Sequence, residues 1–197
     1  MIEPASDSVH GRLSGMLSPM EHLDLDALEA GLGEIRRSPS DTGRLELIVR
    51  RPESGGREVL DEATLDTRVG LEGDNWGTRT ESPSLKAQVT LTNARAVALV
   101  AQTTDRWALA GDQLYVDFDL SGANIPPGTR LAIGSAVVEV SDLPHRGCRK
   151  YLDRFGVDAL KFVNSEAGLE LNLRGINARV VQPGTIRVGD VVRKLPA

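Results

Sequence analysis

Short segments in which apolar and polar residues alternate set the tightest limit on how this chain can fold. Residues 44–50 read Arg-Leu-Glu-Leu-Ile-Val-Arg, and residues 86–91 read Lys-Ala-Gln-Val-Thr-Leu. Because successive side chains of a strand point to opposite faces, this period of two predicts strands with one buried face. We therefore expect Leu45, Leu47 and Val49 to share the buried face of the first strand.

Two turn signals separate further apolar segments. Gly134-Ser135 lies between residues 130–133 and 136–140 and fits a two-residue hairpin turn that needs glycine first. Pro183-Gly184 follows residues 179–182 and precedes a similar segment, which predicts a second hairpin. Many short strands with regular turns predict a mainly β protein with a few short helices, folded as a closed or nearly closed β-barrel.

Three segments favour helices between or before the strands. Residues 23–32 place Leu23, Ala27, Leu28 and Leu32 on one helical face. Asn93 is in position to cap a helix over residues 94–101, and residues 158–163 predict a further short helix.

A boundary is expected at Ser38-Pro39, because proline and small polar residues stop helices. Residues 1–19 are rich in Ser, Gly and Pro without apolar periodicity and are typical of a tail. The chain is therefore expected to divide into an N-terminal tail and short helix (residues 1–40) and a barrel domain (residues 41–197).

The composition restricts the partners and the compartment. The 197 residues carry a net charge of −5, which argues against nucleic acid as a general partner, since phosphate binding needs a basic surface. No apolar run approaches the length of a membrane-spanning helix, and the N-terminus lacks the basic start and apolar run of a signal peptide. We therefore expect a cytoplasmic protein whose partners include neither nucleic acid nor a membrane.

Cys148 is the only cysteine, so the chain can form no internal disulfide. A buried structural cysteine usually has apolar neighbours, but residues 144–150 read Pro-His-Arg-Gly-Cys-Arg-Lys. Cationic neighbours favour the thiolate, the form that attacks sulfur or binds a metal. Pro144 and Gly147 allow the loop to present the sulfur at a rim of the barrel. His145 is either the partner in a Cys–His catalytic pair or a loop histidine bonded to backbone.

Basic residues gather around this thiol although the chain as a whole is acidic. Residues 145–154 contain four Arg or Lys side chains against one acidic residue, Asp153, and Arg174 and Arg179 follow. Such a group indicates a bound anion, for example a phosphate. A solvated charged turn is the alternative.

A second polar segment, residues 66–76, contains two glycines, several carboxylates, Arg68 and Asn75. It contains neither the phosphate-binding loop motif nor the dinucleotide-binding glycine motif. Ligand sites favour barrel mouths, where loops from one rim meet, so we expect Asp74 and Asn75 to lie against the same pocket as Cys148. A polar turn at the opposite rim is the alternative.

Taken together, these pieces resemble the MOSC domain, a family named after the C-terminal domain of molybdenum cofactor sulfurases. The resemblance covers roughly residues 43–195. It rests on Gly70-Leu71-Glu72-Gly73-Asp74, Gln88-Val89-Thr90-Leu91, Pro127-Gly128-Thr129-Arg130-Leu131, Gly147-Cys148-Arg149-Lys150, Arg174-Gly175-Ile176-Asn177-Ala178-Arg179-Val180 and Gly189-Asp190.

This resemblance implies a barrel-like fold and a molybdenum cofactor, the pterin-bound metal. It implies that Cys148, the matching position, carries sulfur as a persulfide or ligates the molybdenum. A sulfur donor such as a cysteine desulfurase, or an electron-donor protein, is the implied partner. No pyridoxal phosphate is expected, because the chain is too short for a desulfurase domain. The residues expected to hold the cofactor are Arg68, Asp74, Asn75, His145, Arg146, Arg149, Lys150, Arg174, Asn177 and Arg179.

Two other functions stay open at this point. One is a molybdenum-dependent reductase of N-hydroxylated compounds, which resembles a different branch of the same family. The other is a non-catalytic barrel that binds a small ligand and in which Cys148 is incidental. If the protein is an enzyme, we expect a sulfur transferase or a molybdenum-dependent oxidoreductase.

Overall fold

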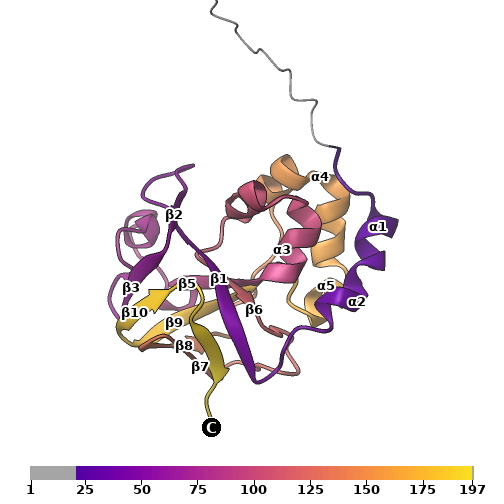
Figure 1. Cartoon of the computed structure of the whole chain (residues 1–197). Coiled ribbons are helices and arrows are strands. Elements are labelled where there is room, and N and C mark those ends of the chain that lie inside the picture. The colour runs from indigo at the N-terminus through magenta and orange to yellow at the C-terminus, as the bar shows by residue number, and fades with distance from the viewer. Residues whose placement is uncertain (1–20, 197) are drawn as a thin grey trace, which may run out of the picture.

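The computed structural model describes residues 21–196 of the chain (Figure 1). The expected tail over residues 1–19 lies outside the described residues. The helices are α1 Leu25–Ala30, α2 Leu32–Ile35, α3 Ala94–Ala101, α4 Arg149–Asn164 and α5 Glu166–Glu170, with 3-10 helices η1 Asn75–Thr78, η2 Leu85–Ala87 and η3 Thr104–Ala110. The strands are β1 Thr42–Arg50, β2 Glu58–Leu60, β3 Glu62–Asp66, β4 Gly70–Leu71, β5 Val89–Asn93, β6 Leu114–Asp117, β7 Arg130–Ile133, β8 Ala136–Val140, β9 Ile176–Gln182, β10 Gly184–Arg187 and β11 Val191–Lys194.

Seven strands close into a barrel, which confirms the predicted fold class. Their order is β11-β7-β8-β9-β5-β6-β1, and β1 closes the ring by pairing with β11 as well as with β6. The β5–β6 pair is parallel, because α3 and η3 carry the chain back between the two strands. The barrel interior is filled by aliphatic side chains and Phe118. A separate small sheet, in the order β10-β3-β4, lies beside the barrel (Figure 1).

A bulge in β1 changes which of its side chains face the barrel interior. The pairing of β1 with β6 shifts between Leu45 and Leu47. As a result, Leu45 and Ile48 join the barrel core, whereas Val49 and Leu47 belong to the core under the helices. The expectation that Leu45, Leu47 and Val49 share one face was wrong, because an extra residue in one strand reverses the alternation beyond it.

Two other strand predictions need correction. Residues 85–87 form η2, so the second predicted strand begins only at Val89, and all five residues of β5 are buried. Pro183-Gly184 does not close a hairpin, since β9 pairs with β5 and β8 whereas β10 pairs with β3 in the other sheet. The hairpin at Gly134-Ser135 is confirmed, and Gly134 adopts a φ of 55° there.

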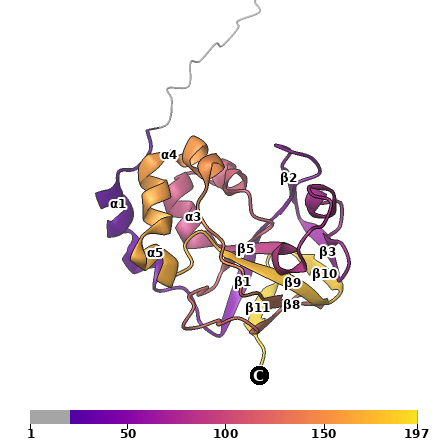
Figure 2. The ribbon, with the colours of Figure 1, turned by 180° about the vertical axis from the view of Figure 1, so that it is seen from behind.

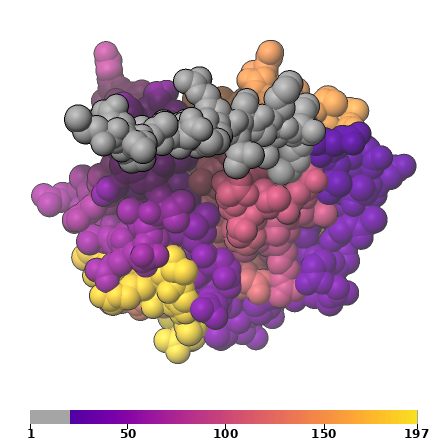
Figure 3. Space-filling view, turned by 45° about the horizontal axis from the view of Figure 1, so that its top comes forward, coloured from indigo at the N-terminus to yellow at the C-terminus, as the bar shows by residue number. Residues whose placement is uncertain are grey.

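The helices gather on one side of the barrel, over a second core built from side chains of α1, α3 and α4 against β1 and β6 (Figure 2). Figure 3 shows the N-terminal helices beside the segment around α3 on that side of the molecule, and the C-terminal strands on the other. The span α4 consists of two helical parts joined at Gly156 (φ 86°, ψ 172°), and the second part agrees with the short helix predicted over residues 158–163, whereas the part before Gly156 was not predicted. Within residues 21–196, no helix is both long and apolar enough to cross a membrane.

Asn93 joins the barrel to the helices. Its side-chain oxygen accepts hydrogen bonds from the backbone N–H groups of Arg95 (2.9 Å) and Ala96 (3.1 Å), which confirms the predicted cap of α3. Its amide nitrogen donates to the carbonyl of Phe118 at 2.9 Å and to the Ser38 hydroxyl at 2.8 Å. One buried side chain therefore satisfies backbone groups of a helix and of the segment after β6.

We predict that Asn93→Ala lowers the free energy of unfolding by about 2–4 kcal/mol, because it removes a helix cap and leaves a buried carbonyl without a donor. Asp24→Ala is the matched control, since Asp24 caps α1 from an exposed position. Its expected cost is about 0.5–1 kcal/mol. Urea unfolding of both variants measures the difference, and equal losses would contradict the role of Asn93 as a junction.

Candidate functional site

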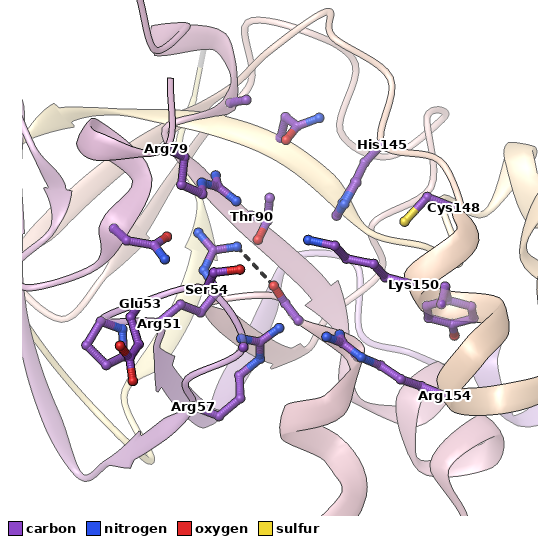
Figure 4. A pocket seen from close by; sticks show the side chains of 18 of the residues that line it. Arg51, Glu53, Ser54, Arg57, Arg79, Thr90, His145, Cys148, Lys150 and Arg154 are labelled. Atoms are coloured by element: carbon purple, nitrogen blue, oxygen red, sulfur yellow. Dashed lines mark hydrogen bonds between the residues drawn. The ribbon is translucent and has the colours of Figure 1, made fainter. Parts of the chain in front are cut away.

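A cavity of about 670 Å³ lies where the barrel meets the helices (Figure 4). Its walls come from the segment after β1, from η1, β5, the end of η3, the loop before α4, the start of α4 and residues 174–177. Six residues that the sequence predicted for the site line it together: Asn75, His145, Cys148, Lys150, Arg174 and Asn177.

Cys148 is exposed at the edge of this cavity, directly before α4. Its carbonyl accepts hydrogen bonds from Tyr151 N (2.9 Å) and Leu152 N (3.1 Å), which fixes the first turn of the helix. Its side chain lines the cavity together with those of His145 and Lys150 (Figure 4). The amino end of a helix carries partial positive charge, so this position and Lys150 both favour a negatively charged ligand beside the sulfur.

Gly147 sets the position of the cysteine. Its N–H donates to Asn164 Oδ1 at 3.0 Å, and Asn164 Nδ2 donates to its carbonyl at 3.3 Å. A Cβ at this position would lie 2.8 Å from side-chain atoms of Leu160 and Val163. Because only glycine fits against the later turns of α4, the loop lies flat on the helix and directs Cys148 toward the cavity.

A buried group of His145, Asp112 and Arg174 forms one wall. Arg174 Nη1 donates to Asp112 Oδ2 at 2.6 Å, and the carboxylate of Asp112 is fully buried. Burial, together with the positive charge of Arg174, lowers the pKa of His145 to about 4, although Asp112 opposes the shift. His145 is therefore neutral at pH 7 and presents one donor and one acceptor nitrogen.

Four buried polar atoms of the site have no hydrogen-bond partner. They are Asn75 Oδ1, Asp112 Oδ1, His145 Nδ1 and Arg174 Nε, and residues 21–196 contain no other buried side-chain atom of this kind. His145 Nδ1 lies 3.5 Å from Asp112 Oδ1, too far for a normal hydrogen bond. Since unsatisfied buried polar groups are costly and rare, this concentration indicates a place for a ligand with both donors and acceptors.

Four arginines are held by consecutive backbone carbonyls at the end of η3. Arg57 donates to the carbonyl of residue 108 (3.2 Å), Arg154 to that of 109 (2.7 Å), Arg174 to that of 110 (3.1 Å) and Arg51 to that of 111 (3.0 Å). Carbonyl oxygens fix the direction of a guanidinium group without cancelling its charge. The cavity is thus strongly basic.

Asp74 supports the wall instead of lining it. Its buried carboxylate accepts from Arg51 Nε (2.8 Å) and Arg51 Nη2 (2.9 Å), and also from Trp76 N at 2.9 Å. With these acceptor positions occupied, Asp74 anchors Arg51 and begins η1, which carries Asn75 into the cavity.

The remaining predicted site residues do not line this cavity. Arg68 is exposed beside Asp66, Arg149 is exposed and paired with Asp153, and Arg179 pairs with Glu139 on the outside of the barrel. Arg146 lines a smaller cavity of about 250 Å³ on the other side of the 141–147 loop.

Sequence reasoning missed Arg51, Arg57 and Arg79, and Thr90 was not selected either. Arg51 and Arg57 flank a loop rich in Pro, Ser and Gly, which is a signal for a ligand-contacting loop. Nothing in the sequence places this loop next to Cys148, because that contact depends on barrel closure.

A family model described as "MOSC domain" matches residues 76–193. Similar solved folds include the YUAD protein from Bacillus subtilis, with a TM-score of 0.56 and 15% identity over 77% of this chain and 94% of that one. YiiM from Escherichia coli gives a TM-score of 0.53 and 19% identity over 78% of this chain and 70% of that one. The curated GTP-binding protein At3g49725, chloroplastic, from Arabidopsis thaliana is 32% identical over 111 residues, which cover 55% of this chain but only 17% of that protein.

We predict that iodoacetate alkylates Cys148 faster than neutral iodoacetamide does, relative to the same pair of rates for free cysteine. A basic cavity concentrates anions, so the normalised ratio should exceed about threefold at low salt and fall as salt is added. Lys150→Ala should reduce the ratio, whereas Lys161→Ala, which removes a lysine paired with Asp158 on the same helix, should not. Equal behaviour of the two variants would contradict a local field at the thiol.

His145 predicts a pH dependence of stability. The unfolded histidine binds a proton near pH 6.5 and the folded one only near pH 4, so the unfolded state binds more protons between these values. The free energy of unfolding should therefore fall as the pH drops from 6.5 to 4, by at most about 3 kcal/mol. The His145→Asn variant should not show this loss of stability between pH 6.5 and pH 4. Urea unfolding of both proteins across this range measures it, and parallel pH profiles would rule it out.

Proposed function

The chain belongs to the MOSC domain family, whose members generally bind the molybdenum cofactor, and we propose that it binds this cofactor in the cavity beside Cys148. The observation that carries the proposal is the single exposed thiol at the edge of a basic cavity whose lining residues Asn75, His145 and Arg174 carry three of the four unsatisfied buried side-chain atoms of residues 21–196.

The donor set of the cavity fits a pterin with a phosphate group. Asn75 Oδ1 is an acceptor suited to the N–H groups on the edge of a pterin, and Arg174 Nε is a donor suited to its carbonyl. The basic side chains are suited to phosphate. A thiolate is a soft ligand that suits molybdenum, and Cys148 supplies it from the edge of the same cavity. When bound, the metal of the cofactor supplies two-electron redox chemistry.

The roles of this chain's residues follow from their positions. Arg174, Asn177 and neutral His145 would orient the ligand by hydrogen bonds, and Lys150 would offset negative charge next to the sulfur. The Gly147–Asn164 contacts would hold Cys148 in place while the ligand enters.

Exposure of Cys148 favours a sulfur-carrier role over that of an inert ligand, because a protein donor can reach the thiol. In this role the Cys148 thiolate attacks the outer sulfur of a persulfide on a donor such as a cysteine desulfurase. The S–S bond of the donor breaks, the donor cysteine leaves as thiolate, and the sulfane sulfur stays on Cys148. No net oxidant is consumed, since the sulfane sulfur is only transferred.

The decisive experiment purifies the full chain from a host that makes the cofactor and measures molybdenum by mass spectrometry and pterin by fluorescence after oxidation. We expect both to co-purify with the protein, and Cys148→Ser to lose molybdenum or sulfur while it keeps the same melting temperature. Absence of both molybdenum and pterin from the folded protein would overturn the cofactor proposal.

Sulfur transfer has its own readout. After incubation with a cysteine desulfurase and cysteine, cyanide should release thiocyanate from the protein, and mass spectrometry should find one added sulfur. Because Cys148 is the only cysteine, any such sulfur is located without ambiguity. Protein that binds molybdenum but accepts no sulfur, and that reduces N-hydroxylated compounds with an electron-donor protein, would favour the reductase function instead.

A further inference from the structure

The cavity contains more positive charge than one phosphate group requires. Six basic side chains line it: Arg51, Arg57, Arg79, Lys150, Arg154 and Arg174. Three carboxylates oppose this positive charge: Glu53, which lines the cavity, and Asp74 and Asp112, which are buried partners of the arginines. With His145 neutral, and before any charge on Cys148 is counted, about three positive charges remain, whereas a phosphate monoester carries about −1.5 to −2 at pH 7.

The excess positive charge can be assigned to individual side chains. Asp74 neutralises Arg51 and Asp112 neutralises Arg174, but no carboxylate in residues 21–196 forms an ion pair with Arg57, Arg79, Lys150 or Arg154. Elsewhere on the described surface, arginines commonly pair with Asp or Glu, as Arg187 does with Glu62. The uncompensated side chains are thus a property of the cavity.

Arg57 and Arg154 form a pair at Gly111. A Cβ on Gly111 would lie 3.3 Å from Arg57 Nη2 and 3.2 Å from Arg154 Nη1, so both guanidinium groups occupy the space beside this glycine. The carbonyls of residues 108 and 109 hold them there despite their like charge. Burial lowers the pKa of Arg57, and so do the charges of Arg154 and Arg51.

Arg79 supplies a second cationic position, on η1's side of the cavity. In Figure 4, Arg79 lies on one side of the Arg51 guanidinium, and Arg57 and Arg154 lie on the other. Burial and the charge of Arg51 lower the pKa of Arg79. Cations on both sides of Arg51 suit two linked phosphates, one on each side.

We infer that this cavity binds a diphosphate group, with one phosphate at the Arg57–Arg154 pair and the other near Arg51 and Arg79. The inference deepens the proposed function, on which it rests for the identity of the cavity, by defining the class of ligand. A nucleoside diphosphate, or a form of the pterin cofactor extended by a nucleotide, has this chemistry.

Calorimetric titration of the full chain, purified without cofactor, tests the inference with inorganic pyrophosphate against inorganic phosphate. Pyrophosphate should bind at least tenfold more tightly. Arg57→Ala and Arg154→Ala should each weaken pyrophosphate at least tenfold, Arg57→Lys should weaken it less, and Arg187→Ala should have no effect. Melting temperatures of all variants identify any that fail to fold. If Arg57→Ala does not fold, the affinity of Arg57→Lys, which keeps the charge, is compared with that of the unmodified protein.

Equal affinity for the two anions, no binding of pyrophosphate, or an equal loss in Arg187→Ala would overturn the inference. Two further arms identify the source of the diphosphate. Tighter binding of a nucleoside diphosphate than of pyrophosphate indicates a free nucleotide, whereas a nucleotide released by acid hydrolysis of molybdenum-loaded protein indicates an extended cofactor. Pyrophosphate binding by a protein that never acquires molybdenum would refute the proposed function and leave the diphosphate site intact.

Discussion

The interaction on which the site depends is the row of carbonyl oxygens at residues 108–111. At the end of η3 four arginine side chains from distant parts of the chain donate to these carbonyls, of which that of residue 108 also accepts from Gly111 N at 3.2 Å. These hydrogen bonds position the cations of the cavity. They also tie the segment after β1, the middle of α4 and the residues before β9 to one point between barrel and helices.

The cavity region combines several features that lower the free energy of unfolding. Like charges lie side by side at Gly111, a histidine is held neutral, and four buried polar atoms lack partners. Such features reduce stability unless a ligand compensates them. A ligand that binds only the folded protein restores that stability, by about 2.7 kcal/mol at one hundred times its dissociation constant. The barrel core, which is filled by aliphatic side chains around Phe118, provides the stability that permits this concentration.

Much of the fold was predictable because it depends on local signals. The Gly134 hairpin and the Asn93 cap are encoded within a few residues, and both were confirmed. Errors arose where the deciding contact is distant: the turn signal at Pro183-Gly184 is the same whether its flanking strands pair or join different sheets. In the site, the loop around Cys148 was visible from its residue types. Arg57 was not, because only barrel closure brings it into the same cavity as the thiol.

Helix α4 links the two ends of this region through its break at Gly156. The first part of the helix follows Cys148 and carries Lys150 and Arg154, whereas Asn164 at its far end forms hydrogen bonds with Gly147. The Gly147–Asn164 hydrogen bonds connect the end of α4 to the residue before Cys148, so both parts of the helix determine where the sulfur lies. Gly156 sets the angle between the two parts, with a positive φ of 86° that favours glycine, and a Cβ there would lie 2.6 Å from His22 Nδ1. The geometry of the thiol and of two cations thus depends on a glycine that is absent from the cavity lining.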